Sequence, residues 1–204
     1  MTGPHLTCCV TKMPPWPAAA ARRCSHRNPG TNTMNHFRYA TSQIAVHWLA
    51  AVLILFLLVT GTFVLAELPN TADKIGNFRI HMILGALAAL LVVARVVLRR
   101  VKPRPPAVVA EKWAHLGHMG LNLLVLLLAV SGGVLALQSG VLAAVLGSAP
   151  LPESLDGWTL RKVHGLVSRL LMALVAVHVL AALYHQWVVK DGLLLRMRPG
   201  KKST

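Results

Sequence analysis

The stretch VHGLVSRLLMALVAVHVLAALY, residues 163–184, has a histidine near each end, His164 and His178. The two lie fourteen residues apart, which in an α-helix is roughly 1400° of rotation, about 40° short of four turns, and roughly 21 Å of rise. Both imidazoles therefore leave one face of a single helix, each near a different surface of a bilayer whose apolar core is about 30 Å thick. An imidazole in lipid is costly unless it is paired, so we expect each histidine to meet a partner on another helix.

The composition of the whole chain indicates an integral membrane protein. Of its 204 residues, 55% are hydrophobic and 13% are charged, whereas a soluble domain has about a quarter charged residues. Long apolar runs at about 44–65, 79–98, 113–137 and 160–189 are each long enough to cross a bilayer as a helix. The two-residue alternation of apolar and polar residues that would indicate a β-barrel is not seen in the sequence. We therefore predict an all-α fold, a bundle of four transmembrane helices that run up and down.

The charge distribution predicts the orientation of this bundle. The chain has 21 Lys and Arg against 6 Asp and Glu, a formal net charge of +15. The excess of positive charge precedes the first apolar run, separates the second from the third, and follows the fourth. The positive-inside rule then places both termini and the middle loop inside. Because no basic face alternates with stacking aromatic residues, we expect no nucleic-acid partner.

Residues 1–33 are rich in Pro, Ala, Arg and Thr and show no hydrophobic periodicity. They lack the apolar segment of a secretory signal, although an organelle transit peptide would fit their arginines. We expect a disordered extension, or a start codon placed too early with Met34 as the initiator, and a membrane domain over 34–204. The cysteines of this segment, Cys8, Cys9 and Cys24, match neither a zinc-site spacing nor the C-x-x-C-H pattern of covalent haem attachment.

Membrane depth selects partners for the two histidines of the fourth span. His47 opens the outward-going first span and lies on the inner side with His178, whereas His81 opens the inward-going second span and lies on the outer side with His164. A polar contact to the backbone or a neighbouring helix is an alternative for each histidine. A zinc site is less compatible, because zinc usually takes four grouped ligands and these spans contain no Cys, Asp or Glu. Two imidazoles per site suit a low-spin haem iron with both axial positions filled, which predicts an electron-transfer cytochrome with two b haems.

Further histidines gather at the predicted inner surface. They could bond to lipid head groups or loop carbonyls, or they could form a quinone pocket in which an imidazole passes a proton to a quinone oxygen. The candidates for this pocket are His115, His118, His185 and Tyr184, with Asn122 and Gln186 as further hydrogen-bonding groups.

Several cations accompany the apolar spans. Arg79, Arg161 and Lys162 stand two or three residues before an outer-side histidine. They could snorkel to the membrane surface, bind haem propionates, or raise the arrival rate of a small anion. Arg95 and Arg169 lie within apolar runs. Arg95 is close enough to the inner end to snorkel, whereas Arg169 should have a partner, and a propionate is a candidate for both.

Three motifs resemble the bacterial cytochrome b561 family. They are QIAVHWL at 43–49, AHLGH at 114–118 and KDGLLLRM at 190–197, and the resemblance extends from Met34 to the last residue. The spacing of His164 and His178 also resembles that in cytochrome b subunits of membrane formate dehydrogenases and hydrogenases. The resemblance implies a multi-pass protein of the bacterial inner membrane with two b haems, whose ligands map onto His47, His81, His164 and His178.

The resemblance also implies an activity. Family members exchange electrons with quinone near the inner haem, and one branch oxidises superoxide at the outer face and passes the electrons to ubiquinone. The short loops and outer basic residues resemble that branch, whereas the 1–33 extension departs from it, and Gln186 stands where a second histidine often follows. An anchor subunit that relays electrons between a periplasmic dehydrogenase or hydrogenase and quinone is one alternative. A non-redox membrane protein whose histidines carry protons or metal is another.

Overall fold

The computed structural model describes residues 39–69, 71–101 and 111–197, and it confirms an all-α membrane fold. The first and last spans are helices α1 (Thr41–Thr60) and α5 (Thr159–Tyr184), continued by π-helical turns η1 (Gly61–Leu65) and η2 (His185–Val189). Between them lie α2 (Lys74–Val101) and α3 (Glu111–Gln138), and two short helices, α4 (Val141–Val145) and α6 (Leu193–Arg196), follow α3 and η2. In the described part, four segments are long and apolar enough to cross a membrane. The prediction for 1–33 lies outside the described residues.

The helices begin and end where local chemistry demands it. Within lipid, every backbone polar group must bond inside its own segment, so the Leu-, Val- and Ala-rich runs are helical throughout. Gly140 and Gly147 both have a φ of 81°, a left-handed conformation that glycine adopts without steric cost. They separate α3 from α4 and end α4, where the N–H groups of Gly147 and Ser148 donate to the carbonyls of Ala144 and Ala143.

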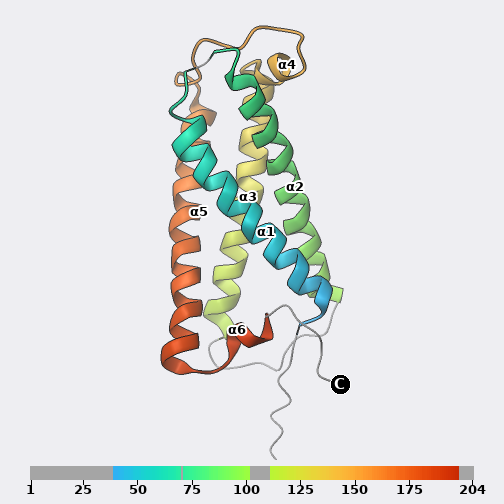
Figure 1. Ribbon diagram of the computed structural model, residues 1–204, viewed down its shortest axis with the longest axis vertical. Coiled ribbons are helices and arrows are strands. Elements are labelled where there is room, and N and C mark those ends of the chain that lie inside the picture. The colour runs from blue at the N-terminus through green and yellow to red at the C-terminus, as the bar shows by residue number, and fades with distance from the viewer. Residues whose placement is uncertain (1–38, 70, 102–110, 198–204) are drawn as a thin grey trace, which may run out of the picture. The chain divides into compact units, whose positions relative to one another are not determined.

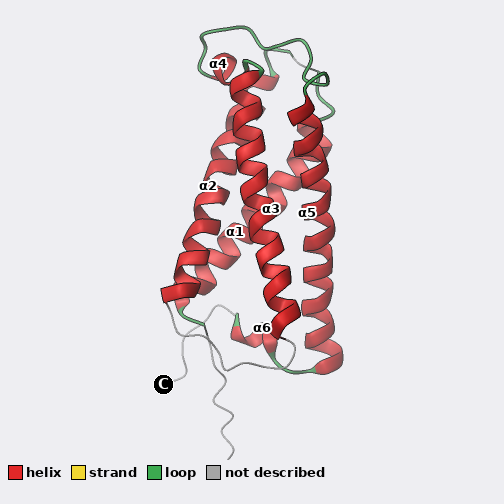
Figure 2. Cartoon of the chain, turned by 180° about the vertical axis from the view of Figure 1, so that it is seen from behind, coloured by secondary structure: helices red, strands yellow, loops and turns green. Residues whose placement is uncertain are grey.

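The long helices pack as sequential neighbours: α1 against α2, α2 against α3, and α3 against α5. Figure 1 shows α1 in front of α3, with α2 and α5 on either side. In the opposite view of Figure 2, α3 lies in front of α1. Two clusters of buried apolar side chains hold the bundle together. One lies around Leu171, which is 1% exposed, and the other joins Phe78 to α4. Large apolar side chains remain exposed along every long helix, as expected for surfaces that contact lipid.

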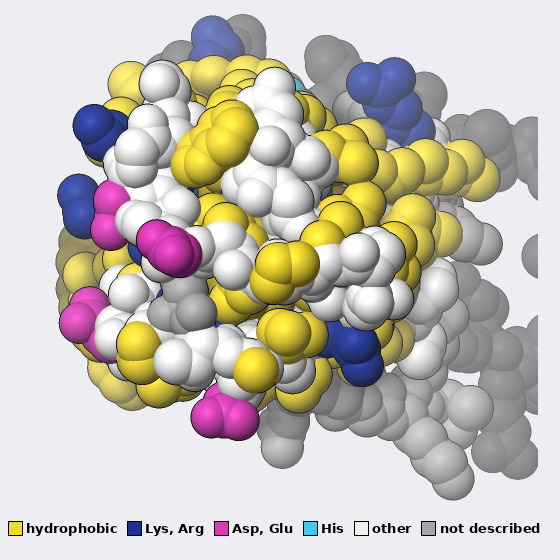
Figure 3. Space-filling model, turned by 90° about the horizontal axis from the view of Figure 1, so that it is seen from above, with side chains coloured by type: hydrophobic (Ala, Val, Ile, Leu, Met, Phe, Trp, Pro, Cys, Tyr) yellow, Lys and Arg dark blue, Asp and Glu magenta, His cyan; other side chains and the backbone are white. Residues whose placement is uncertain are grey.

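One end of the bundle carries α4, the loop from α1 to α2 and the loop from α4 to α5, and we call it the α4 end; the opposite end carries α6, and we call it the α6 end (Figure 1). Seen from above, the α4 end shows acidic and basic side chains around hydrophobic ones (Figure 3). The Arg79 guanidinium donates a 2.6 Å hydrogen bond to the Val145 carbonyl and so binds the last turn of α4 to α2. Which end faces the periplasm stays a prediction from the positive-inside rule.

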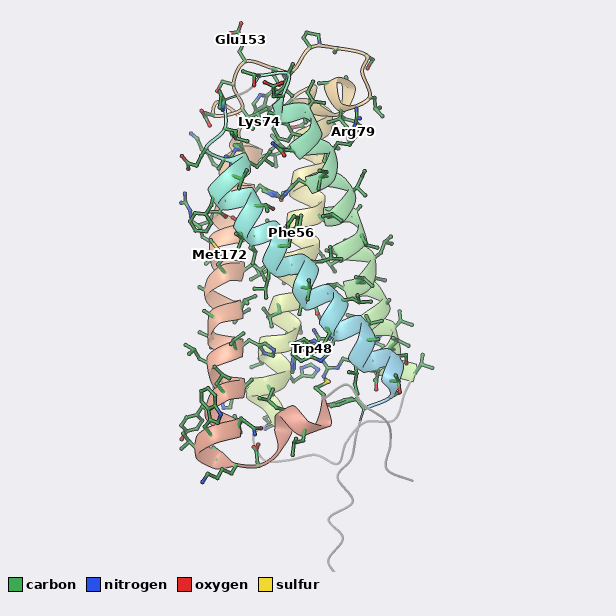
Figure 4. The ribbon with its side chains drawn as sticks, in the orientation of Figure 1. Trp48, Phe56, Lys74, Arg79, Glu153 and Met172 are labelled. Atoms are coloured by element: carbon green, nitrogen blue, oxygen red, sulfur yellow. The ribbon has the colours of Figure 1, made fainter. Side chains whose placement is uncertain are left out.

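Lys74, at the start of α2, is buried, which is unusual for a lysine. It is 6% exposed, its Nζ donates a 2.5 Å hydrogen bond to the Leu68 carbonyl, and its ammonium lies 5.4 Å from the centre of the Phe78 ring (Figure 4). A cation is unfavourable at a helix N-terminus, so its contacts with the α1–α2 loop have to hold it there.

Replacing this lysine tests whether it fastens the loop. Lys74→Met keeps the side-chain length but removes the charged donor, and we expect it to lower the free energy of unfolding by about 2 kcal/mol, as is typical of a hydrogen bond to a charged group. Thermal unfolding followed by circular dichroism in detergent measures this. Lys112→Met, at an exposed position on α3, is the control. Equal unfolding midpoints for both variants would show that the buried contacts contribute nothing.

Candidate functional site

A pair of imidazoles from different helices lies toward the α4 end. His81 on α2 and His164 on α5 are both half-buried, with ring centroids 6.4 Å apart and an interplanar angle of 69°. A nitrogen ligand lies about 2 Å from a first-row metal ion, and roughly 1 Å more separates it from its ring centroid, so rings on opposite sides of one ion have centroids about 6 Å apart. The spacing of His81 and His164 therefore fits one metal ion between them.

Two glycines leave room for these rings. A Cβ added at Gly61 would lie 3.1 Å from His81 Cε1, and one added at Gly132 would lie 3.0 Å from His164 Cε1. Both distances are shorter than ordinary van der Waals contact. Gly61 begins the π-helical turn η1, and such turns are frequent at functional sites. The backbones of α3 and of η1 thus approach the imidazoles as closely as they do only because these residues have no side chain.

The two imidazoles differ in their hydrogen bonds. His164 Nδ1 lies 3.1 Å from the hydroxyl oxygen of Ser131, a residue of α3 that is 8% exposed. His81 Nδ1 is buried and has no hydrogen-bond partner among the described residues. Because the Nδ1 edge of His164 contacts Ser131, its Nε2 remains to bind a metal.

The cations predicted near this pair have different surroundings. A guanidinium nitrogen of Arg161 lies 3.7 Å from the position of a Cβ on Gly165, so this side chain extends forward along α5, beside His164. Lys162 is exposed. Arg79 contacts α4 as described above, and Arg169 is exposed on α5. Arg161 is therefore the predicted cation that the structure brings beside the histidine pair.

Toward the α6 end, three helices contribute imidazoles to one region. The rings of His118 on α3 and His178 on α5 have centroids 5.3 Å apart at 68°, which is shorter than the spacing that fits one metal ion between them. His47 on α1 lies close enough to His178 and to Arg95 for their charges to interact. His118 therefore lies among the candidate ligands of this region, whereas the sequence suggested for it either a position bonded to head groups and loop carbonyls or a place in a quinone pocket.

A small polar pocket adjoins this region. Its lining comes from α1, α2, α3 and the residues just before α1 and just after α6: Tyr39, Gln43, Arg95, Arg99, His118 and Met197. The Trp48 indole donates a 3.0 Å hydrogen bond to the Met197 carbonyl and so connects the end of α6 to α1. Sequence reasoning did not select Arg99, Tyr39 or Gln43, although the spacing of Arg95 and Arg99 places both on one helix face.

The remaining quinone candidates lie in different surroundings. His115 is exposed on α3. His185, at the start of η2, places Nδ1 2.6 Å from Asp191 Oδ2, and its ring contacts Tyr184 edge-to-face at 6.0 Å. Asp191 was not among the residues predicted for the site, and the only indication of it in the sequence is that it follows His185 by six residues. Among the described residues, no three His, Cys, Asp or Glu side chains are grouped as metal ligands.

The sequence profile of the prokaryotic cytochrome b561 family matches residues 38–200. The chain belongs to this family. The match includes all four membrane spans and every histidine considered above. This cytochrome b561 is therefore a multi-pass protein of the bacterial inner membrane, and it is a b-type cytochrome that takes part in electron transfer.

Individual relatives are similar along almost their whole length. The chain is 29% identical to the probable superoxide oxidase CybB of Yersinia pestis over 82% of this chain and 99% of the relative. It is also 29% identical to cytochrome b561 homolog 1 of Escherichia coli, over 81% of this chain and 99% of that one. Cytochrome b562 of Cereibacter sphaeroides is 29% identical over 78% and 94% respectively.

The residues present fit the haem b that family membership implies. Haem iron takes nitrogen ligands from histidine on both faces in low-spin cytochromes. At the α4 end the fit rests on the ring spacing of His81 and His164, the glycines beside them, and the buried Nδ1 of His81. At the α6 end it rests on the donor set alone, three imidazoles from three helices.

Proposed function

We propose that this cytochrome b561 oxidises superoxide at the α4 end, outside the membrane, and reduces ubiquinone at the α6 end, inside. Two superoxide anions each give up one electron and leave as dioxygen, and ubiquinone takes up the two electrons and two protons to become ubiquinol. The observation that carries the proposal is the His81–His164 pair beside Arg161, an electron-accepting site next to a fixed positive charge. The similarity to a probable superoxide oxidase supports the choice of donor.

The proposal assigns two haem sites. His81 and His164 would hold haem b at the α4 end, and His47 and His178 would hold it at the α6 end. Bound haem would supply a one-electron iron couple, and two histidines at each site would leave dioxygen no place on the iron. Arg95, beside His47, is the best placed of the propionate candidates at the α6 end, while Arg79 and Arg169 stay predictions.

At the α6 end, the His185–Asp191 pair supports proton delivery to the quinone. The carboxylate of Asp191 holds the imidazole by its Nδ1 at 2.6 Å, which fixes the ring, so that in its doubly protonated form the Nε2–H can donate to a quinone oxygen. His118, with a buried Nδ1 that has no partner among the described residues, is a second candidate. His115 and Tyr184 are exposed and would contact the quinone only at the membrane surface.

Two measurements test this function. The pyridine haemochromogen assay should give two b haems per chain. In stopped flow, a pulse of superoxide should reduce the purified cytochrome with no partner protein present, and added ubiquinone should reoxidise it. A chain that serves as anchor for a dehydrogenase would not respond to the pulse, and a non-redox protein would show no b-type bands in a dithionite-reduced minus oxidised spectrum. Either result would exclude the proposal.

The cations at the α4 end should control the rate at which an anion arrives. The double substitution Arg161→Glu and Lys162→Glu reverses the local charge, and we expect it to slow reduction by superoxide about tenfold at low salt, because charged clefts raise on-rates by at least this factor. Reduction by a neutral quinol should change far less, and the difference should fade as salt is added. Lys112→Glu, at an exposed position of α3 at the α6 end, is the control. An equal slowing of superoxide reduction in this variant would show that Arg161 and Lys162 do not steer the anion.

A further inference from the structure

Ser131 is a buried polar residue with two hydrogen-bonding neighbours. It lies on α3 and is 8% exposed. Its hydroxyl donates to the Leu128 carbonyl at 3.3 Å, and the same oxygen lies 3.1 Å from His164 Nδ1. A buried serine hydroxyl in a membrane helix is costly without hydrogen-bond partners. The Leu128 carbonyl alone would satisfy the Ser131 hydroxyl, so the contact with His164 calls for a further explanation.

The hydrogen-bond geometry around Ser131 favours one tautomer of His164. A hydroxyl has one hydrogen, and that of Ser131 is used by the Leu128 carbonyl, which can only accept. With that hydrogen on Leu128, the Ser131 oxygen accepts from His164, which corresponds to the tautomer with its proton on Nδ1, the form that a metal ligand at Nε2 requires. Nε2 then has its lone pair free. The chain His164 Nδ1–H, Ser131 Oγ–H, Leu128 C=O prepares the ring as a metal ligand.

His81 has no equivalent support. Its Nδ1 is buried without a partner among the described residues, and its position is limited by Gly61 through packing alone. The two imidazoles of the pair are therefore unequal, since one is oriented by a hydrogen bond and the other by contact. Outer hydrogen bonds of this kind orient a ligating histidine and raise its basicity.

We propose that Ser131 is a positioning residue for the haem site at the α4 end, which orients His164 and strengthens it as an electron donor to iron. This rests on the proposed ligation by His81 and His164. A more basic ligand stabilises ferric over ferrous iron, so Ser131 lowers the reduction potential at the α4 end relative to the α6 end. That difference makes electron transfer from the α4 end to the α6 end more favourable.

Ser131→Ala removes the acceptor and tests this directly. In a potentiometric titration followed by optical and low-temperature EPR spectra, we expect the midpoint potential of one haem to move to more positive values while the other stays unchanged. The low-spin EPR signal of the same haem should shift, because a freed His164 no longer holds the 69° interplanar angle with His81. Retention of that haem should weaken about tenfold, as is common when an outer hydrogen bond is lost.

Three further variants make the result decisive. Ser131→Thr restores the hydroxyl and should restore the potential and the signal. Ser131→Cys keeps the shape of the side chain but offers a weaker acceptor. It should shift the midpoint potential and the EPR signal in the same direction as Ser131→Ala, and it serves as the test if the alanine variant does not fold. Ser139→Ala is the matched control, because the hydroxyl of Ser139, the residue that follows α3, donates to the Leu135 carbonyl at 2.7 Å and has no hydrogen bond to a histidine among the described residues.

Unchanged potentials and signals in folded Ser131→Ala or Ser131→Cys would overturn the inference, as would an equal shift in Ser139→Ala. His164→Ala separates this failure from failure of the function. If it loses one haem while Ser131→Ala changes nothing, the ligand proposal stands and only the role of Ser131 is wrong. If His164→Ala keeps both haems, the proposed ligation itself is wrong.

Discussion

His178→Ala is expected to leave the protein with one b haem of two and without ubiquinone reduction. His178 lies in the region where α1, α3 and α5 bring imidazoles together, and an alanine offers iron no ligand. The haem content should fall by half, and turnover with ubiquinone should fall more than about 100-fold, since outer-shell changes alone already cost 10–100-fold at metal sites. The haem at the α4 end should still be reduced by superoxide.

Two parallel variants make this result interpretable. His115→Ala removes an exposed histidine near the α6 end and should keep both haems. His118→Ala is more informative, because the His118 ring lies 5.3 Å from that of His178. If His118→Ala loses the haem and His178→Ala retains it, the ligand at this end comes from α3 and the pairing of His47 with His178 is wrong.

Gly132→Val is expected to abolish haem binding at the α4 end and with it reduction by superoxide. A Cβ at this position would lie 3.0 Å from His164 Cε1 and 3.3 Å from Nδ1, before the two methyl groups of valine are added. The backbone of α3 is rigid, so His164 must rotate away from His81 and the pair can no longer share one metal ion. We expect one haem per chain in the pyridine haemochromogen assay, and the α6-end haem should keep its spectrum.

Gly133→Val supplies the control for this substitution. Gly133 is the next residue of the same helix, and a Cβ there would meet nothing within 4 Å. The variant therefore has the same helix propensity change without the contact, and we expect two haems and normal superoxide oxidation. Equal haem loss in both variants would mean that valine disturbs α3 itself and that Gly132 has no special role.

The sequence predicted the four spans well because the signal is local. Each apolar run is set by the free energy of transferring its own residues into lipid, and the runs at 44–65, 79–98, 113–137 and 160–189 correspond to helices of the structure. The helix ends differ by a few residues. α2, for example, begins at Lys74, five positions before the predicted start, because its first turn lies beyond the apolar run.

The site was predictable only in part. The depth of each histidine follows from its place in a span and brings His81 and His164 to one end, where their rings lie 6.4 Å apart. The surroundings of these histidines did not follow. Glycines are common in membrane helices, so nothing in the sequence distinguished Gly132 from Gly133. Nor did any local pattern indicate that Ser131 contacts His164, thirty-three positions away.

The sequence by itself determined that this chain is an all-α membrane protein with histidines at two depths, since hydropathy and helical rise are properties of each segment alone. The tertiary structure decided which groups meet. The contact of Ser131 with His164, the approach of His118 to His178 and the burial of Lys74 depend on how each helix is rotated about its axis against its neighbours. That rotation is a balance of packing among side chains of several helices, which no single segment contains.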